Sequence, residues 1–163
     1  MSATSNELAS EGTPTYLGAG DPGRTVTDFA FNTTAAKDYH PVWLDRLADD
    51  VTLEGAMMNG AVRGPEAVRE LIGFVRTLYE DQQFSFAGPF GDDGFLEVYN
   101  SRVRGEPVGS VVLVSRNAAG EANHVVVNYR PRRSIMLVSE LVGEHFAGSP
   151  LAQHFATRAE VQR

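Results

Sequence analysis

The sequence predicts an α+β fold in which helices come first and paired strands follow. Two patterns predict it. After Pro65 the apolar residues recur at helical spacing, as Val68, Leu71, Ile72, Val75, Leu78 and Tyr79. From Gln83 onward the period changes to two, in short runs between glycine-rich turns, which is typical of consecutive antiparallel hairpins. A chain of 163 residues is the size of one domain, and such a domain buries about 70% of its unfolded surface.

The first half of the chain is predicted to contain three helices and one strand. Pro41 and Pro65 each suit the first position of a helix, where the missing N–H removes no hydrogen bond. In order, the predicted elements are a flexible arm over residues 1–24, a helix over 25–36, a short helix from Pro41 that buries Trp43, Leu44 and Leu47, a strand over 51–58, and the helix from Pro65.

The second half is predicted to be a meander of strands. The strands cover residues 84–86, 95–104, 107–116, 123–130 and 134–142. One face of the second strand carries Phe95, Glu97, Tyr99, Ser101 and Val103. Gly105-Glu106 is predicted to form a two-residue hairpin turn, and Ser149-Pro150-Leu151 to start a short helix. One domain is therefore expected over residues 25–145, followed by a C-terminal tail over 146–163.

Composition excludes several classes of function. The chain has no cysteine, so disulfides and thiolate-bound metals are excluded. A net charge of −7 and a pI near 5.0 argue against binding to nucleic acid or to an anionic membrane. No apolar run approaches the roughly 20 residues of a membrane span, and the N-terminus lacks the basic start and apolar stretch of a signal peptide. A cytoplasmic location is therefore expected.

No motif predicts a cofactor or a metal. Residues 18–23 match GxGxxG, but the βαβ frame that gives this motif its meaning is missing, so a flexible turn is favoured over a dinucleotide site. The four histidines lack the spacing of metal ligands, so we expect no metal site. A nucleophile elbow and a phosphate-binding loop are also missing from the sequence.

Charged residues inside the predicted strands are the candidate catalytic groups. They are Glu54, Glu97, Arg102, Arg130 and Glu140. A carboxylate that faces inward in a curved sheet can act as a general acid or base with a raised pKa. The alternative is that each charge faces water or forms a cross-strand ion pair, which is the more common arrangement for any single residue.

Other residues are candidates for lining a pocket. Tyr99 and Asn128 alternate onto faces with mostly apolar partners, where they are either polar anchors of a pocket or interfacial core residues. Aromatic and methionine residues can also line a pocket, although they are more often core. This set is Phe31, Trp43, Met57, Met58, Phe74, Tyr79 and Met136.

One stretch of the sequence resembles a known family. Residues 47–72 read LADDVTLEGAMMNGAVRGPEAVRELI, which combines L-A-D-D, a strand, a glycine turn and a G-x-E-A-V helix. With a helix before it and a meander after it, this order over about residues 25–145 is similar to the NTF2-like superfamily, and within it to SnoaL-like domains. The resemblance implies a cone-shaped α+β barrel, in which a strongly curved, mostly antiparallel sheet wraps around the N-terminal helices and leaves an apolar pocket. It also implies a homodimer through the outer face of the sheet.

The resemblance lets the family's chemistry be compared position by position. Where ketosteroid isomerases have a catalytic aspartate this chain has Gly55, and their helix-1 tyrosine falls at Phe31. Their second oxyanion acid falls near Val112, so we do not expect ketosteroid-type isomerisation. Epoxide hydrolases of this fold use an Asp-Arg-Asp relay, for which the matching charges here are Glu97, Arg102 and Glu140.

The sequence thus predicts a cofactor-free acid–base enzyme that acts on a hydrophobic small molecule by isomerisation, cyclisation, dehydration or hydrolysis. The candidate catalytic residues are Glu54, Glu97 and Glu140. The candidate ligand-binding residues are Phe31, Trp43, Met58, Phe74, Tyr79, Tyr99, Arg102, Asn128 and Arg130. The alternative is a non-catalytic small-molecule-binding or dimerisation module. A desolvated carboxylate that faces a pocket favours the enzyme, whereas carboxylates that all face solvent favour the module.

Overall fold

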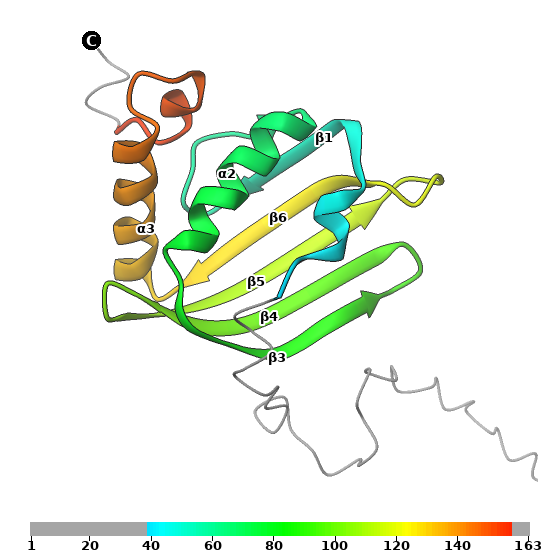
Figure 1. The fold of residues 1–163 in the computed structure, drawn as a ribbon, viewed down its shortest axis with the longest axis horizontal. Helices are drawn as coiled ribbons and strands as arrows, with labels where there is room; N and C mark the ends of the chain where they lie inside the picture. Colours follow the sequence, from blue (N-terminus) through cyan, green and yellow to red (C-terminus); the bar gives the residue numbers. More distant parts are fainter. Residues whose placement is uncertain (1–38, 158–163) are drawn as a thin grey trace, which may run out of the picture.

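The computed structural model describes residues 39–157, which form one curved sheet with a helix across its inner face (Figure 1). The predicted arm and first helix, with Phe31, lie outside the described residues. The strands are β1 Leu47–Gly55, β2 Val62–Arg63, β3 Glu80–Phe90, β4 Gly94–Val103, β5 Glu106–Arg116 and β6 Ala122–Arg130. The helices are α2 Pro65–Thr77 and α3 Arg132–His145, with the short 3-10 helices η2 Val42–Asp45 and η3 Pro150–His154.

The six strands form one sheet in the order β2-β1-β6-β5-β4-β3. β3, β4, β5 and β6 follow one another as antiparallel hairpins, and β2 pairs antiparallel with β1. β1 pairs in parallel with β6. Parallel pairing is possible here because the two strands are far apart in the sequence and no hairpin turn joins them. The sheet is therefore curved and mostly antiparallel, and the predicted α+β class is confirmed.

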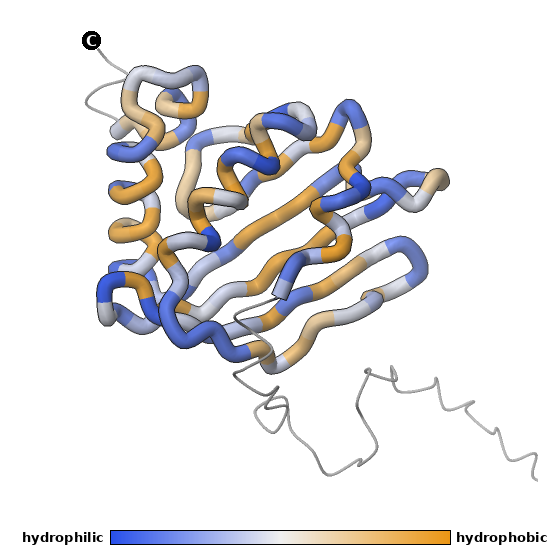
Figure 2. Tube along the Cα trace, viewed as in Figure 1, coloured by the Kyte–Doolittle hydropathy of each residue, from blue (hydrophilic) through white to orange (hydrophobic). Residues whose placement is uncertain are grey.

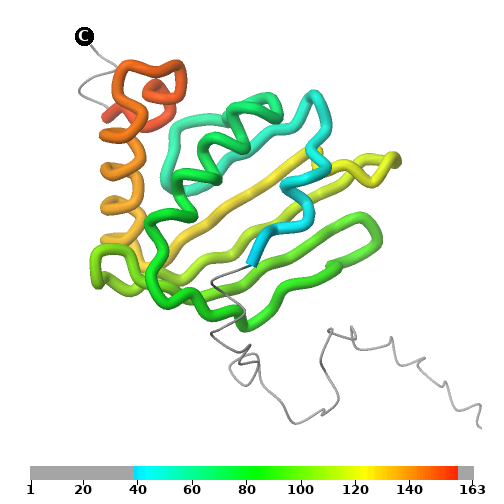
Figure 3. Tube along the Cα trace, in the orientation of Figure 1, coloured from blue at the N-terminus to red at the C-terminus, as the bar shows by residue number. Residues whose placement is uncertain are grey.

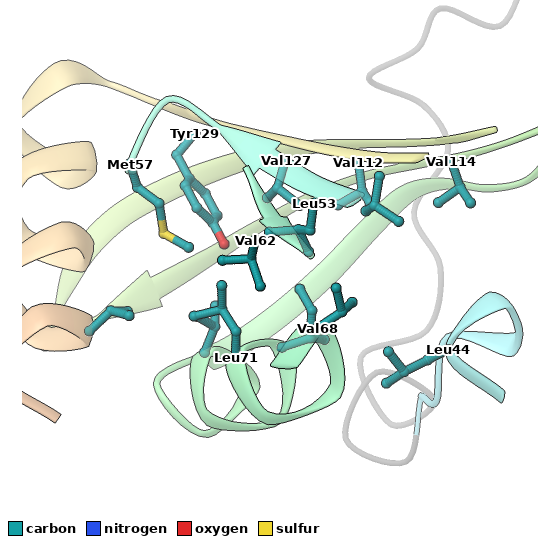
Figure 4. Packing of buried hydrophobic residues seen from close by; sticks show 14 of the residues in the cluster. Leu44, Leu53, Met57, Val62, Val68, Leu71, Val112, Val114, Val127 and Tyr129 are labelled. Atoms are coloured by element: carbon teal, nitrogen blue, oxygen red, sulfur yellow. The ribbon is translucent and has the colours of Figure 1, made fainter. Parts of the chain in front are cut away.

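The helix α2 forms where the sequence predicts it. Pro65 lies in its first turn, and Gly64 before it has a φ of 89°, a conformation that favours glycine. The buried face of the helix consists of Val68, Leu71, Ile72 and Val75. Figure 4 shows Leu71 directed from α2 toward Val62 on β2. The amphipathic pattern therefore seats α2 on the inner face of the sheet.

The core lies between α2 and this inner face. Strand alternation supplies most of it, and Figure 2 shows the hydrophobic stretches along the central strands. The inward residues of β5 and β6 are Val108, Val112, Val114, Val125, Val127 and Tyr129. Fully burying a valine contributes roughly 1.5 kcal/mol or more relative to leaving it exposed, so this valine-rich face holds the sheet against α2.

The second predicted helix is shorter than expected. The 3-10 helix η2 ends at Asp45, and Leu47 begins β1 instead of continuing the helix. The chain leaves the helix because the backbone oxygen of Arg46 accepts a hydrogen bond of 2.8 Å from the backbone N–H of Ala122, the first residue of β6. The strand predicted over residues 51–58 therefore starts at Leu47 and ends at Gly55.

The prediction of a strand over residues 134–142 is wrong. This segment lies in α3, whose buried residues recur at helical spacing: Ser134, Val138, Leu141 and Val142. Three of its nine residues, Ile135, Val138 and Val142, are β-branched and favour a strand by propensity, but the spacing of its buried residues decides in favour of the helix. A helix therefore follows the last strand, and Glu140 is an exposed residue of that helix rather than a strand residue.

Two smaller features can be compared with their predictions. The β4–β5 turn falls one residue earlier than predicted, on Arg104 and Gly105, which have φ of 49° and 77°. Two positive φ angles in a two-residue turn match the type I′ geometry that hairpins prefer. The predicted helix start in the tail is confirmed, because Ser149 Oγ accepts a hydrogen bond of 3.2 Å from Leu151 N and η3 follows.

The close approach of β1 and β6 requires a glycine at position 55. A Cβ atom there would lie 1.9 Å from the backbone oxygen of Val127. We expect Gly55→Ala to lower the free energy of unfolding by about 2 kcal/mol or more, because the backbone of Val127, unlike a side chain, cannot change rotamer to relieve the clash with the new Cβ. Gly73→Ala is the matched control, because a Cβ at Gly73 has no neighbour within 4 Å, and it should raise stability by about 0.5–1 kcal/mol. Urea denaturation measures both, and unchanged stability of Gly55→Ala would contradict the β1–β6 register.

Candidate functional site

Glu97 lies at the centre of β4 with its side chain directed inward. The alternate residues of this strand are buried on one face, as predicted: Phe95, Glu97, Tyr99, Ser101 and Val103. Glu97 is only 3% exposed. Glutamate is almost never this deeply buried unless it is paired, so the surroundings of its carboxyl group decide what the site can do.

Two donors hold one oxygen of this carboxyl group. Tyr39 Oη donates to Glu97 Oε1 at 2.7 Å, and Trp43 Nε1 donates to the same atom at 2.9 Å. Both donors come from the segment that leads into β1, where η2 follows Pro41 and Trp43 is buried. A buried indole N–H needs an acceptor, and Glu97 provides one. Within residues 39–157, Glu97 Oε2 makes no hydrogen bond.

Burial raises the pKa of Glu97, because the charged form loses its hydration. The hydrogen bonds from Tyr39 and Trp43 and the charge of Arg76 act in the opposite direction and partly offset this rise. Arg76 lies on α2 and donates to the backbone oxygen of Tyr39, but it forms no ion pair with Glu97. Glu97 therefore takes up and releases a proton at a higher pH than an exposed glutamate, as a general acid or base requires.

Three tyrosines form a hydrogen-bonded group, the tyrosine cluster, beside Glu97. Tyr79 Oη lies 2.9 Å from Tyr99 Oη and 2.7 Å from Tyr129 Oη. Tyr99 on β4 and Tyr129 on β6 both pair with Ser110 of β5, so the register places them on either side of one small residue. Burial raises the pKa of Tyr99 to about 12, and it raises the pKa values of Tyr79 and Tyr129 well above their ordinary value. The three phenols thus stay protonated, and two hydrogen bonds within the cluster leave one hydroxyl proton for another acceptor.

These side chains surround a small cavity, the Glu97 cavity. Its volume is about 30 Å³, which is room for about two water molecules. It is lined by Tyr39, Arg76, Gln82, Glu97 and the tyrosine cluster, with Pro41, Ile72, Val75, Val112 and Val127 as apolar neighbours. Pockets for drug-sized ligands measure about 300–1,000 Å³. The cavity that the described residues form around Glu97 is therefore much smaller than such a pocket.

Solved structures share this architecture. An uncharacterised protein with a cystatin-like fold from Silicibacter pomeroyi matches with a TM-score of 0.61 and 17% identity, over 71% of this chain and 86% of that one. A steroid delta-isomerase from Pseudomonas aeruginosa matches with a TM-score of 0.60 and 17% identity, over 71% of this chain and 91% of that one. The chain has an NTF2-like fold. No protein-family model matches its sequence, and no curated protein does.

The polar groups of the Glu97 cavity stand at other positions than the resemblance to ketosteroid isomerases implies. Gly55 stands where the sequence resemblance places the ketosteroid isomerase aspartate, and the backbone of Val127 leaves no room there for a side chain. Val112, near the position of the second oxyanion acid, is an apolar wall of the Glu97 cavity. The carboxyl group at the centre of this site is therefore supplied by Glu97 on β4, at a different position.

The structure separates the candidate residues into two groups. Glu97, Tyr79 and Tyr99 line the Glu97 cavity, and Trp43 donates to Glu97 from beside it. The remaining described candidates do not line this cavity: Glu54, Met58, Phe74, Arg102, Asn128, Arg130 and Glu140. Sequence alternation thus placed β4 on the correct face, whereas Asn128 and Arg130 on β6 are exposed on the opposite face.

Three of these outlying residues have other partners. Glu54 Oε1 lies 2.7 Å from His124 Nε2 on β6, which is the exposed cross-strand pair named as the alternative for such residues. Arg102 Nη1 donates to the backbone oxygen of Gly105 at 2.9 Å. Phe74 stacks on His145 of α3, with ring centroids 3.6 Å apart. These contacts are structural and give no reason to place chemistry there.

Sequence reasoning missed four polar residues of the site: Tyr39, Arg76, Gln82 and Tyr129. Tyr129 had a readable signal, because Val125 and Val127 precede it with period two and point to the same inner face. Arg76 sits in the last turn of α2, where a cation is ordinarily explained by the helix dipole. Tyr39 lies in an irregular segment, where periodicity carries no information about side-chain direction.

The site combines the Glu97 carboxyl group and four tyrosine phenols with the side chains of Arg76, Gln82 and Trp43. Among residues 39–157, no group of three or more histidine, aspartate or glutamate side chains is placed to hold a metal ion. None of the described helices is long and apolar enough to cross a membrane. The groups that line the Glu97 cavity can transfer a proton and donate or accept hydrogen bonds.

The raised pKa of Glu97 predicts how stability varies with pH. The folded state holds the Glu97 proton to a higher pH than the unfolded chain does. The stability that this proton contributes is full below the ordinary glutamate pKa of 4.5, and it is lost as the pH rises through the folded pKa. Glu97→Gln keeps an acceptor for Tyr39 and Trp43 but carries no charge, so we expect it to be more stable than wild type at pH values above that pKa by about 1 kcal/mol or more.

Urea denaturation at a series of pH values measures this difference. The difference should shrink toward acidic pH, where wild-type Glu97 is itself protonated. Glu140→Gln, at an exposed position of α3, is the control and should follow the wild-type curve. A Glu97→Gln variant less stable than wild type across the whole range would show that the carboxylate is a net stabilising group, against this account.

Proposed function

We propose that the protein is a cofactor-free acid–base catalyst for a small molecule, with Glu97 as the group that moves the proton. The observation that carries the proposal is the asymmetry of its carboxyl group. Tyr39 and Trp43 both donate to Oε1, which leaves Oε2 without a hydrogen bond from the described residues. A fixed Oε1 and a free Oε2 provide one oriented atom for proton transfer.

The tyrosine cluster supports the second half of such a reaction. When Glu97 Oε2 takes a proton from a carbon next to a carbonyl group, the electron pair moves to the carbonyl oxygen. The remaining hydroxyl proton of the cluster can hydrogen-bond that oxygen, and the positive charge of Arg76 favours it as well. Glu97 then returns the proton to a second carbon in an isomerisation, or to a departing hydroxyl group in a dehydration.

The walls of the cavity support an apolar substrate body. Ile72, Val112 and Val127 provide apolar surface opposite the polar groups. A molecule larger than about two waters can enter only if lining side chains such as Tyr39 move. Tyr39 also donates a hydrogen bond to Glu97 Oε1. Displacement of Tyr39 would weaken this hydrogen bond, so substrate entry would also affect the protonation of the carboxyl group.

A non-catalytic binding module is the second candidate. The small volume of the Glu97 cavity favours it, because the buried side chains fill most of the inner face. In that case the hydrogen bonds of Glu97 would serve only to fix the segment before β1. The two candidates differ in one property, which is whether the protein accelerates the exchange of a carbon-bound proton.

Deuterium exchange tests the proposed catalysis without knowledge of the natural substrate. A panel of small cyclic ketones is incubated with the protein in deuterated water, and the α-protons are followed by NMR. We expect wild-type protein to accelerate exchange for at least one ketone, and Glu97→Gln to reduce the acceleration by about 100-fold or more. Glu54→Gln is the control and should retain it. Equal exchange in wild type and Glu97→Gln would refute the proposal.

We also propose that the outer face of the sheet binds a second copy of the chain. Apolar residues of three strands meet on this face: Leu96, Val98, Val111, Leu113 and Val126. The strand register places Leu96, Leu113 and Val126 in one row, and Leu113 is 38% exposed. A second copy presents the same patch, so two copies can cover each other through a two-fold axis.

Analytical ultracentrifugation tests this interface. Leu113→Asp places a charge in the centre of the row, so we expect it to shift a wild-type dimer to monomer. Met136→Asp is the matched control, because Met136 is 58% exposed on α3, away from the sheet, and it should leave the dimer intact. A wild-type protein that sediments as a monomer at all accessible concentrations would rule the dimer out.

A further inference from the structure

A groove of about 390 Å³, the Arg130 groove, lies at the end of the sheet where β4 turns into β5 and β6 runs into α3. Figure 1 shows the β4–β5 turn beside the start of α3. Two contacts hold these parts together: Ser134 Oγ donates to the backbone oxygen of Pro107 at 2.7 Å, and Arg133 Nη2 lies 2.9 Å from Glu106 Oε2. The Arg130 groove is far larger than the Glu97 cavity and shares no lining residue with it.

A glycine in the middle of β5 shapes this groove. Asn100 on β4, Gly109 on β5 and Arg130 on β6 lie in one row across the three strands. A Cβ atom on Gly109 would lie 2.7 Å from both Cζ and Nε of Arg130, so the arginine side chain lies across β5 where a side chain is missing. Glycine weakens a strand interior, and one such position often marks a close approach. Here the close approach of the Arg130 side chain to Gly109 directs the guanidinium across β5 toward Asn100 on β4.

The guanidinium of Arg130 has no ion-pair partner among the residues that the structure describes. No carboxylate of residues 39–157 lies within ion-pair distance of it. The nearby acids have other partners, because Glu106 pairs with Arg133 and Glu80 Oε2 accepts a hydrogen bond of 3.2 Å from Gly105 N. Arg102 and Arg132, near the same end of the sheet, are also exposed and form no ion pair with the described residues. This end of an otherwise acidic protein therefore carries a local excess of positive charge.

From this arrangement we propose that the Arg130 groove binds a small organic anion, a carboxylate or phosphate attached to an apolar body. The guanidinium of Arg130 provides a planar donor for two oxygens of the anion, and the Asn100 side chain provides a further donor across the row. Pro107, Val108 and Pro131 line the groove and supply the apolar surface for the body. The proposal is independent of the chemistry at Glu97.

The observations favour a small anion over a nucleic acid. A nucleic acid needs positive charge spread along several phosphates, whereas here one oriented arginine faces one groove. The net charge of −7 also opposes a long polyanion, but it has little effect on a single anion held at short range by charge-assisted hydrogen bonds.

Titration of the full chain with three probes tests the proposal: phenyl phosphate, benzoate and benzyl alcohol. We expect at least one of the two anions to bind saturably by NMR chemical-shift mapping onto Asn100, Gly109 and Arg130. Benzyl alcohol, which has the ring without the charge, should not bind there. Arg130→Gln should weaken anion binding by about tenfold or more, because it removes the charge-assisted hydrogen bonds.

Two further variants test whether binding depends on the position of the Arg130 charge or only on the number of positive charges. Gly109→Ala keeps every charge but forces Arg130 aside, so it should also weaken binding. Arg116→Gln removes an arginine at the far end of β5, where it lies 5.6 Å from the Phe95 ring centroid, and should change affinity by less than about twofold. Equal binding by wild type and Arg130→Gln, equal losses in Arg130→Gln and Arg116→Gln, equal binding of benzyl alcohol, or failure of both anions to bind would each overturn the proposal.

Discussion

The buried carboxyl group of Glu97 is the constraint on which the rest of the site depends. A carboxyl group inside an apolar core costs several kcal/mol unless its oxygens are hydrogen-bonded. Tyr39 and Trp43 supply two hydrogen bonds to one oxygen, and they can do so only if the segment before β1 lies across the sheet. The same interactions therefore satisfy Oε1 of Glu97 and hold Trp43 in the core, and the described residues give Oε2 no hydrogen bond.

The sheet register explains why polar and apolar groups separate so cleanly around this carboxyl group. Ser110 occupies one inward position of β5, and the tyrosines opposite it on β4 and β6 have room to reach Tyr79. The next inward residues, Val112 and Val114, are apolar and pack against the core. A one-residue shift of this register would expose the tyrosine cluster and bury the charges of the outer face. The placement of Glu97 and the tyrosine cluster on the inner face is thus a consequence of strand alternation.

The sequence predicted correctly the elements with a clear hydrophobic periodicity, and it predicted wrongly those in which the periodicity covers few residues or fits both a helix and a strand. Alternation along β4 placed Glu97 and Tyr99 inward, and helical spacing identified α2. The strand predicted over 134–142 is a helix, because β-branched residues masked a helical spacing. The sequence could not predict the role of Tyr39, because Tyr39 lies in an irregular segment and its hydrogen-bond partner Glu97 is 58 positions away in the sequence. Residues paired across such distances are visible only once the fold is known.

The central claim is that Glu97 exchanges a proton at raised pKa while Trp43 stays bound to its carboxyl group. Trp43 is the only tryptophan of the chain and donates directly to Glu97, so its fluorescence reports the charge of that group. A pH titration of the fluorescence should show a transition with its midpoint above 4.5, the ordinary value for glutamate, and Glu97→Gln should abolish it. A transition that persists unchanged in Glu97→Gln, or a wild-type midpoint at or below 4.5, would contradict the account.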